Sequence, residues 1–276
     1  MYVASPLTDR CHFSERFKII AIIHWICRIS DQLARKACET EGVSDTATPI
    51  VAAFDLDGTL TEGGSVFAWL RFIAGRSTAN RAAFRLAFPL VVGVIRSGES
   101  ADNAKERLFH ALLAGRDVAE VTTQSSVFAI EHLESHLRER VAGRLAWHLE
   151  QGHGVVVVSA SPQIYVDVMA AEVKAHGALG TRLAVDARDK FTGSYLGKNC
   201  RGTEKMRRLQ EWIDERGYSS PPEIYAYGNS RGDRRLLRGA THPFAAGRLG
   251  RLGSLNRFPR LPKNPPGDAT ADESKD

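Results

Sequence analysis

The chain has few cysteines and no hydrophobic run long enough to cross a membrane. Its 276 residues include four cysteines, Cys11, Cys27, Cys38 and Cys200, whose spacing forms neither a pairing pattern nor a zinc motif. A disulfide framework is therefore excluded, and a reducing, cytoplasmic environment is favoured. The most apolar stretch, residues 17–29, is shorter than the about 20 apolar residues of a transmembrane helix, and it contains basic residues.

Residues 17–29, "FKIIAIIHWICRI", begin too late for a signal peptide and lack a clear small-residue cleavage site. The isoleucines of this stretch follow helical spacing. Three interpretations remain open: a helix packed on the main domain, an extension added by a wrong start codon, or a helix on a membrane surface. We expect a cytoplasmic protein, with peripheral contact at the inner membrane surface as the alternative.

Acidic residues are missing between Glu62 and Glu99, a span that contains five arginines and the apolar segment 84–95. One interpretation is a pair of helices whose apolar faces pack together. The other is a basic, apolar surface that faces an anionic lipid headgroup or an acyl chain. Residues 248–263 also contain basic but no acidic side chains. The formal net charge is +5, but the arginines that contribute to it are scattered along the chain, so they do not indicate nucleic acid as a partner. The sequence does not reveal the oligomeric state.

Short apolar runs alternate with helical segments along most of the chain. The runs "IVAAF", "GVVVVSAS", "EIYAYG" and "HPFAA" are typical of buried parallel strands, and residues 181–197 read as a short strand and a hairpin. This order predicts an α/β fold with a parallel sheet and right-handed crossovers, in which the segment after the first strand is helical. The expected divisions are an N-terminal extension and linker at 1–49, a core at 50–60 and 151–247, a cap at 61–150 and a disordered tail at 248–276.

Polar residues follow the predicted strands directly. Asp55, Ser159 and Asn229 each stand at the carboxyl end of an apolar run, and Asp57 comes two residues after Asp55. Ligands of open α/β sheets bind beyond the carboxyl ends of the strands, so these side chains should converge.

Two carboxylates as close as Asp55 and Asp57 repel each other unless a cation lies between them. Magnesium prefers oxygen ligands and combines carboxylates with a substrate phosphate. Asp55 can then act as a carboxylate nucleophile on phosphorus, while Asp57 protonates the leaving oxygen and activates water. Ser159 and Lys205 offer a hydroxyl and a cation to the phosphate, and the oxygens of Asn229 and Asp233 are candidate metal ligands. Arg201 competes with Lys205 for the role of the cation.

Four motifs in order resemble the haloacid dehalogenase superfamily of phosphohydrolases: DLDGT at 55–59, SAS at 159–161, Lys205, and GNSRGD at 228–233. The helical insertion after the first motif is similar to subfamily IB, which includes phosphoserine phosphatases and a phosphatidylglycerophosphate phosphatase. The resemblance implies an α/β fold with a Rossmann-like parallel sheet core and a helical cap inserted after the first strand. It implies a magnesium-dependent reaction through an aspartyl-phosphate. It also implies that Asp55 is the nucleophile, that Asp57 is the acid/base, and that the backbone carbonyl of Asp57 binds the metal.

The sequence departs from this pattern in two places. Asn229 stands where the fourth motif usually begins with Asp, so either Asp233 replaces it as a ligand or Asp233 orients Asn229. Phosphoserine phosphatases carry an acidic residue shortly after the first motif. Here Glu62 lies close to the turn and residues 63–69 carry no acid, which argues against phosphoserine.

The sequence therefore predicts a magnesium-dependent phosphomonoester hydrolase. Its substrate is expected to be a small phosphorylated metabolite or the phosphate of a phospholipid headgroup. The alternative is a binding or regulatory protein on the same fold, with catalysis weakened by Asn229.

Overall fold

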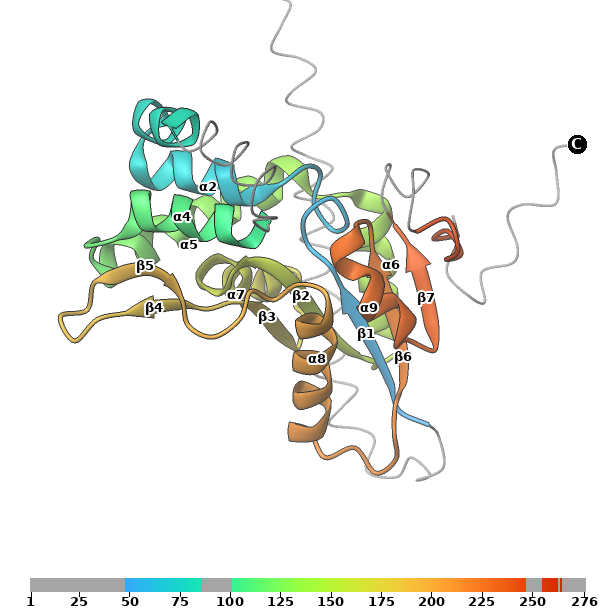
Figure 1. Ribbon diagram of the computed structural model, residues 1–276. Coiled ribbons are helices and arrows are strands. Elements are labelled where there is room, and N and C mark those ends of the chain that lie inside the picture. The colour runs from blue at the N-terminus through green and yellow to red at the C-terminus, as the bar shows by residue number, and fades with distance from the viewer. Residues whose placement is uncertain (1–47, 86–100, 247–254, 263, 265–276) are drawn as a thin grey trace, which may run out of the picture.

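The computed structural model describes residues 48–85, 101–246, 255–262 and 264 (Figure 1). Residues 1–47 lie outside this part of the chain, and so does the predicted helix at 17–29. Among the residues described, no helix combines the length and the apolar character needed to cross a membrane.

A five-stranded parallel sheet forms the centre of the molecule, in the order β3-β2-β1-β6-β7. The strands are β1 (Ile50–Phe54), β2 (Gly154–Pro162), β3 (Gly177–Thr181), β6 (Glu223–Gly228) and β7 (His242–Ala245). The predicted α/β fold with a parallel sheet is confirmed.

The register of the sheet brings the expected polar residues to one edge. Phe54, the last residue of β1, pairs with Val157 on one neighbouring strand and with Tyr227 on the other. Asp55 therefore lies beside the parts of β2 and β6 that lead into Ser159 and Asn229.

The strands are apolar on both faces because both faces are covered. Ala52 and Phe54 belong to a core shared with α6 (Glu139–Glu150), α7 (Gln163–Glu172) and the inserted helices. Val51 and Ala53 belong to a second core with α8 (Thr203–Glu215) and α9 (Arg234–Arg238). In Figure 1, α8 and α9 lie in front of the sheet and α6 lies behind it.

The segment between β1 and β2 is helical, as predicted. Its elements are α2 (Ser65–Ala74), a helical stretch at 76–85, α4 (Ala101–Leu113) and α5 (Val118–His136), followed by α6. The helix α6 falls inside the predicted cap range of 61–150 but contacts β1 and β2 of the core.

The hairpin of β4 (Leu183–Val185) and β5 (Phe191–Tyr195) lies against α4 of the insertion. Gly193 allows this close approach, because a Cβ atom there would come within 2.3 Å of the Cα of His110. The backbone of Gly193 also has a φ of +83°, which favours glycine.

The expectation of a disordered tail from 248 onward is not met at residues 255–262. Leu255 and Leu261 are buried, and the N–H of Leu261 donates to the carbonyl of Ala245 at 3.3 Å. Apolar side chains spaced through this basic segment give it surface to bury, which outweighs its glycine, proline and charge. The other residues of the tail, except Asn264, lie outside the described part.

Candidate active site

Asp55 lies directly after β1 and is almost fully buried, with 5% of its surface exposed. Its Oδ1 accepts a hydrogen bond from Lys205 Nζ at 2.5 Å, and its Oδ2 accepts one from Thr59 Oγ1 at 2.7 Å. Burial and the nearby charge of Asp233 raise the pKa of Asp55 to about 7, although Lys205 opposes this rise. The carboxyl group is therefore held in a dry site whose counter-charge comes mainly from one lysine.

Asp57 is held from two directions. The backbone N–H of Ser65 at the start of α2 donates to its Oδ1 at 2.8 Å, and the hydroxyl of Ser161 donates to its Oδ2 at 2.5 Å. A helix N-terminus favours a nearby carboxylate, so α2 contributes both a donor and its dipole. The hydroxyl of Ser65 lies 2.8 Å from that of Tyr165, which extends the network into the core.

Lys205, in the first turn of α8, lies between two carboxylates. Its Nζ donates to Asp233 Oδ1 at 2.6 Å as well as to Asp55. Burial alone would lower the pKa of Lys205, but the charges of Asp233 and Asp55 hold it above its usual range. Arg201, the competing cation, instead contacts Asp102 at 3.3 Å. The geometry therefore places Lys205, and not Arg201, beside Asp55.

Asp233 uses its second oxygen to organise the loop after β6. Its Oδ2 accepts hydrogen bonds from the N–H of Asn229 at 3.2 Å, and from the N–H and hydroxyl of Ser230 at 2.9 and 2.8 Å. Burial alone would raise the pKa of Asp233, but Lys205 and these donors hold it below its usual value. Both oxygens of this carboxylate are thus engaged by donors of the chain itself.

Ser159 lies near the carboxyl end of β2, and Asn229 directly follows β6; both of these strands pair with β1. Ser159 is buried, and its hydroxyl accepts from the N–H of Ser161 at 3.1 Å. Asn229 packs so closely on Gly58 that a Cβ atom at Gly58 would lie 1.9 Å from Asn229 Nδ2. The Oδ1 of Asn229 is buried and accepts no hydrogen bond. An oxygen left without a donor in a buried site is what a hard cation would bind.

The oxygens near Asp55 fit a magnesium ion. In the part of the chain that the structure describes, no three His, Cys, Asp or Glu side chains form a metal-binding group. The candidate ligands here are of mixed type: the carboxylate of Asp55, the backbone carbonyl of Asp57 and the amide oxygen of Asn229. All are oxygens, which suits magnesium, and the unpartnered Oδ1 of Asn229 supports the assignment.

The model of the haloacid dehalogenase-like hydrolase family matches residues 52–238, a range that contains most of β1, the insertion and all four motifs. The chain belongs to this family. The curated relatives include protein CicA of Caulobacter vibrioides, which is 32% identical over 193 residues and covers 68% of this chain and 82% of the relative. They also include a histidinol-phosphatase of Neisseria meningitidis, which is 24% identical over 197 residues. That match covers 71% of this chain and 89% of the relative.

Among solved structures, a protein of unknown function from Bordetella pertussis Tohama I has a TM-score of 0.66. It is 23% identical and covers 79% of this chain and 100% of its own, so it supports the fold alone. The predicted superfamily and the predicted class, a phosphoric monoester hydrolase, are confirmed by the family match and by relatives with phosphatase names. The predicted helical insertion of subfamily IB is consistent with them.

A cavity of about 750 Å³ opens beside Asp57, one of the candidate catalytic residues. The core contributes Asp57, Ser161 and Asn229 to its walls, and the insertion contributes Glu62 and Lys105. Glu62 is exposed, and no described residue pairs with its carboxylate. The cavity therefore lies between the sheet edge and the cap, with one uncompensated acidic side chain at its wall.

Sequence reasoning missed Lys105, because no motif marks it and its contacts come from distant segments. Its Nζ donates to the carbonyl of Ala160 at 2.6 Å and to Asn199 Oδ1 at 3.0 Å. It also lies 5.7 Å from the ring centres of Phe109 and Tyr195. Burial lowers the pKa of Lys105 to about 8. This cation connects α4 of the cap to the end of β2.

Arg138 was also missed. It follows α5 where the chain returns from the cap, and its guanidinium donates to the carbonyls of Gly58 at 2.8 Å, Thr59 at 3.3 Å and Ala246 at 2.6 Å. A single side chain therefore links the end of the cap to the loop that carries Asp57.

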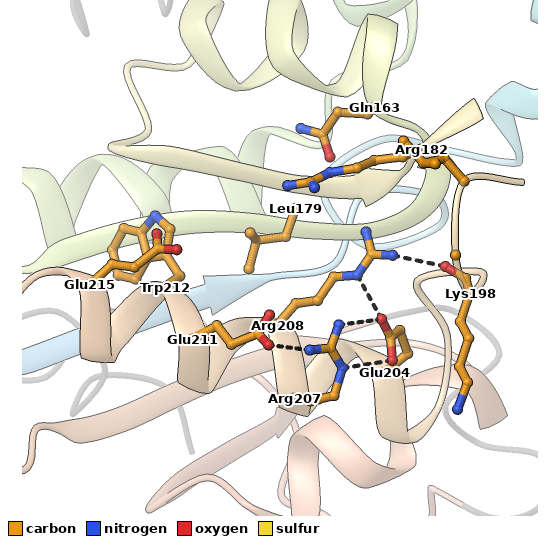
Figure 2. A pocket seen from close by; sticks show the side chains of 12 residues that line it. Gln163, Leu179, Arg182, Lys198, Glu204, Arg207, Arg208, Glu211, Trp212 and Glu215 are labelled. Carbon is orange, nitrogen blue, oxygen red and sulfur yellow. Dashed lines mark hydrogen bonds and ion pairs between the residues drawn. The ribbon is translucent and has the colours of Figure 1, made fainter. Parts of the chain in front are cut away.

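A second pocket, of about 370 Å³, lies on the other side of α8 (Figure 2). Two of its arginines are paired with acidic side chains: Figure 2 shows Arg207 paired with Glu204 and Glu211, and Arg208 paired with Glu204. The hydrogen bonds from Arg207 lower the pKa of Glu204 to about 2. The residues that line this pocket include none of the four motifs, so it is no rival to the cavity beside Asp57 as the active site.

Proposed function

We propose that the protein hydrolyses small phosphomonoesters in two steps, with Asp55 as the nucleophile. The observation that carries this proposal is the position of Asp55 at the sheet edge, where it accepts a hydrogen bond from Lys205. The Oδ1 of Asn229, which follows the next strand of the sheet, has no partner among the described residues. A buried lysine beside the carboxylate supplies positive charge where charge develops on the transferred phosphoryl group.

In the first step an oxygen of Asp55 forms a bond to phosphorus, and the bond from phosphorus to the ester oxygen breaks. Asp57 delivers its proton to that leaving oxygen. In the second step Asp57 takes a proton from water, whose oxygen attacks the aspartyl-phosphate and releases phosphate together with the free carboxylate. Lys205 and the hydroxyl of Ser159 bind the phosphoryl oxygens in both steps.

Magnesium bound by Asp55, the Asp57 carbonyl and Asn229 would neutralise charge on the phosphoryl group. We propose that Asp233 does not bind magnesium directly, because its two oxygens already accept hydrogen bonds from Lys205 and from the loop after β6. It keeps Lys205 and Asn229 in place.

The substrate we propose is the phosphate ester of a small amino alcohol. Glu62 is an acidic group on the cavity wall without a partner among the described residues, and it can bind an amine. The volume of about 750 Å³ suits a small metabolite. The relative named histidinol-phosphatase is consistent with this class. A phospholipid phosphate, the other expected substrate, has no such support from the cavity.

The test is phosphate release from p-nitrophenyl phosphate with magnesium and with a chelator, followed by a panel of histidinol phosphate, phosphoserine, lysophosphatidate and phosphatidylglycerophosphate. Magnesium-dependent turnover is expected, with amine-bearing soluble esters preferred. The variant Glu62→Gln should raise KM for those esters and leave p-nitrophenyl phosphate unaffected. No turnover of any ester would favour the alternative, a binding or regulatory protein. Turnover of lipid esters alone would contradict the substrate class.

A further inference from the structure

The cap contains a cavity of its own, of about 570 Å³, between α2 and α5. Its walls include Arg71 and Phe72 from α2, Arg76 from the next helical stretch, and His132 and His136 from α5. None of the residues that line it also lines the cavity of about 750 Å³ beside Asp57. It is therefore separate from the proposed active site.

Two buried nitrogen atoms of this cavity have no hydrogen-bond partner among the described residues: Nε of Arg71 and Nε2 of His132. The side chain of His132 is firmly placed, with only 6% of the residue exposed. Its ring stacks on His136 at 4.1 Å between centres, and on Phe128 at 5.1 Å. Buried polar groups are normally paired, so two unpaired nitrogens on one cavity wall indicate a missing acceptor.

The charge of the cavity indicates what that acceptor is. Within the described residues, neither Arg71 nor Arg76 forms an ion pair, and Arg71 contacts only the ring of Phe67, at 5.8 Å. One acidic residue, Glu131, is on the wall. Burial, followed by the nearby His136, lowers the pKa of His132 to about 4, so the ring is neutral at pH 7. A neutral imidazole carries one N–H, and the tautomer with the proton on Nε2 is the one that donates into the cavity. Two unpaired guanidinium groups and an imidazole N–H suit an acceptor with negative charge.

We propose that this cavity binds a small oxyanion, of the phosphate or carboxylate class, through Arg71, Arg76 and Nε2 of His132. The site adjoins the base of the cap, where the carbonyl of His136 accepts from the N–H of Glu62 at 2.7 Å. It does not depend on the proposed catalytic roles, because it uses none of those residues.

The test follows the side-chain nitrogens of His132 by NMR in the full chain labelled with ¹⁵N-histidine, without magnesium. The His132 signal is assigned from its loss in His132→Gln. Inorganic phosphate and acetate are titrated separately at constant ionic strength set with chloride. We expect a saturable shift of Nε2 with at least one of the two anions, and the comparison tells which class the site prefers.

Variants separate this site from the active site. Arg71→Met should weaken the His132 response by about tenfold or more, since it removes a charge-assisted donor. Arg76→Met, at an exposed position, serves the same purpose if Arg71→Met does not fold. Arg81→Met is the matched control, because Arg81 is exposed and does not line the cavity.

Two results would overturn the proposal. One is a His132 signal that neither anion shifts. The other is a shift that persists unchanged in Arg71→Met and Arg76→Met, which would mean that it comes from binding elsewhere.

Discussion

The backbone N–H of Ser65 lies 2.8 Å from Oδ1 of Asp57, so the first helix of the cap begins at the proposed acid/base. The other oxygen of Asp57 accepts from Ser161, which belongs to β2 of the core. One carboxylate is therefore positioned jointly by cap and core. A carboxylate fixed in this way needs no reorientation when it gives its proton to the leaving group.

Ser161→Ala should lower kcat by about tenfold, because Asp57 loses the donor that fixes its position for proton transfer. Ser161→Thr should restore most of the rate, because it keeps the hydroxyl. The measurement is steady-state hydrolysis of p-nitrophenyl phosphate. Ser126→Ala, on the exposed side of α5, is the control. An Ala variant with wild-type kcat would show that Ser161 does not position Asp57.

Asp55→Asn should abolish turnover and leave the fold intact. An amide cannot form the aspartyl-phosphate, while its shape still fits beside Lys205 and Thr59. Phosphate release and the near-UV circular dichroism spectrum are measured on the same sample. A folded variant that keeps most of its activity would exclude Asp55 as the nucleophile.

Lys105 should make substrate binding depend on pH. The pKa of Lys105 is lowered to about 8, so its ammonium is charged below this pH and neutral above it. The charged form makes stronger hydrogen bonds to Ala160 and Asn199, which hold α4 on the core. We therefore expect KM to increase as the pH rises through about 8.

Lys105→Met should have a higher KM at pH 7 and should lose this step in the pH profile. Lys198→Met, with an exposed side chain on the far pocket, should behave as wild type. The substrate is p-nitrophenyl phosphate, whose phosphate group does not titrate near pH 8. A step that survives in Lys105→Met would assign the titration to another group.

Much of the proposed site could be predicted from the sequence, because its residues lie near or directly after the carboxyl ends of strands. The apolar runs of β1, β2 and β6 determine which residues come to the sheet edge, and Asp55, Ser159 and Asn229 follow from that alone. The residues left Lys205 and Arg201 as competing cations, and the resemblance favoured Lys205, which the structure places between Asp55 and Asp233.

Other contacts depend on how distant segments pack, and no local pattern records this. Lys105 meets Ala160 and Asn199 only because the hairpin of β4 and β5 lies against α4. The tail was misjudged at Leu261 for a related reason. Its composition is typical of disorder, but β7 offers an edge and an apolar surface on which it packs.

Replacing the amide of Asn229 by a carboxylate should change the magnesium requirement, whereas replacing the carboxylate of Asp233 by an amide should change the stability of the fold. Asn229→Asp adds a charge where the unpartnered Oδ1 now lies, so the magnesium concentration for half-maximal activity should fall. Turnover need not rise, because a further carboxylate reduces the charge that magnesium directs at the phosphoryl oxygens. Asp233→Asn should instead destabilise the fold by about 3–5 kcal/mol, because it leaves Lys205 with one partner and weakens the loop.

The two effects are separated by measuring activity against magnesium concentration and unfolding in urea for both variants. If Asp233 only organises the loop, the folded fraction of Asp233→Asn keeps a magnesium requirement close to that of wild type. If Asp233 is itself a ligand, the requirement rises sharply at unchanged stability. The hydrogen bonds to both of its oxygens favour the first result, since a carboxylate with four donors has little capacity left for a metal.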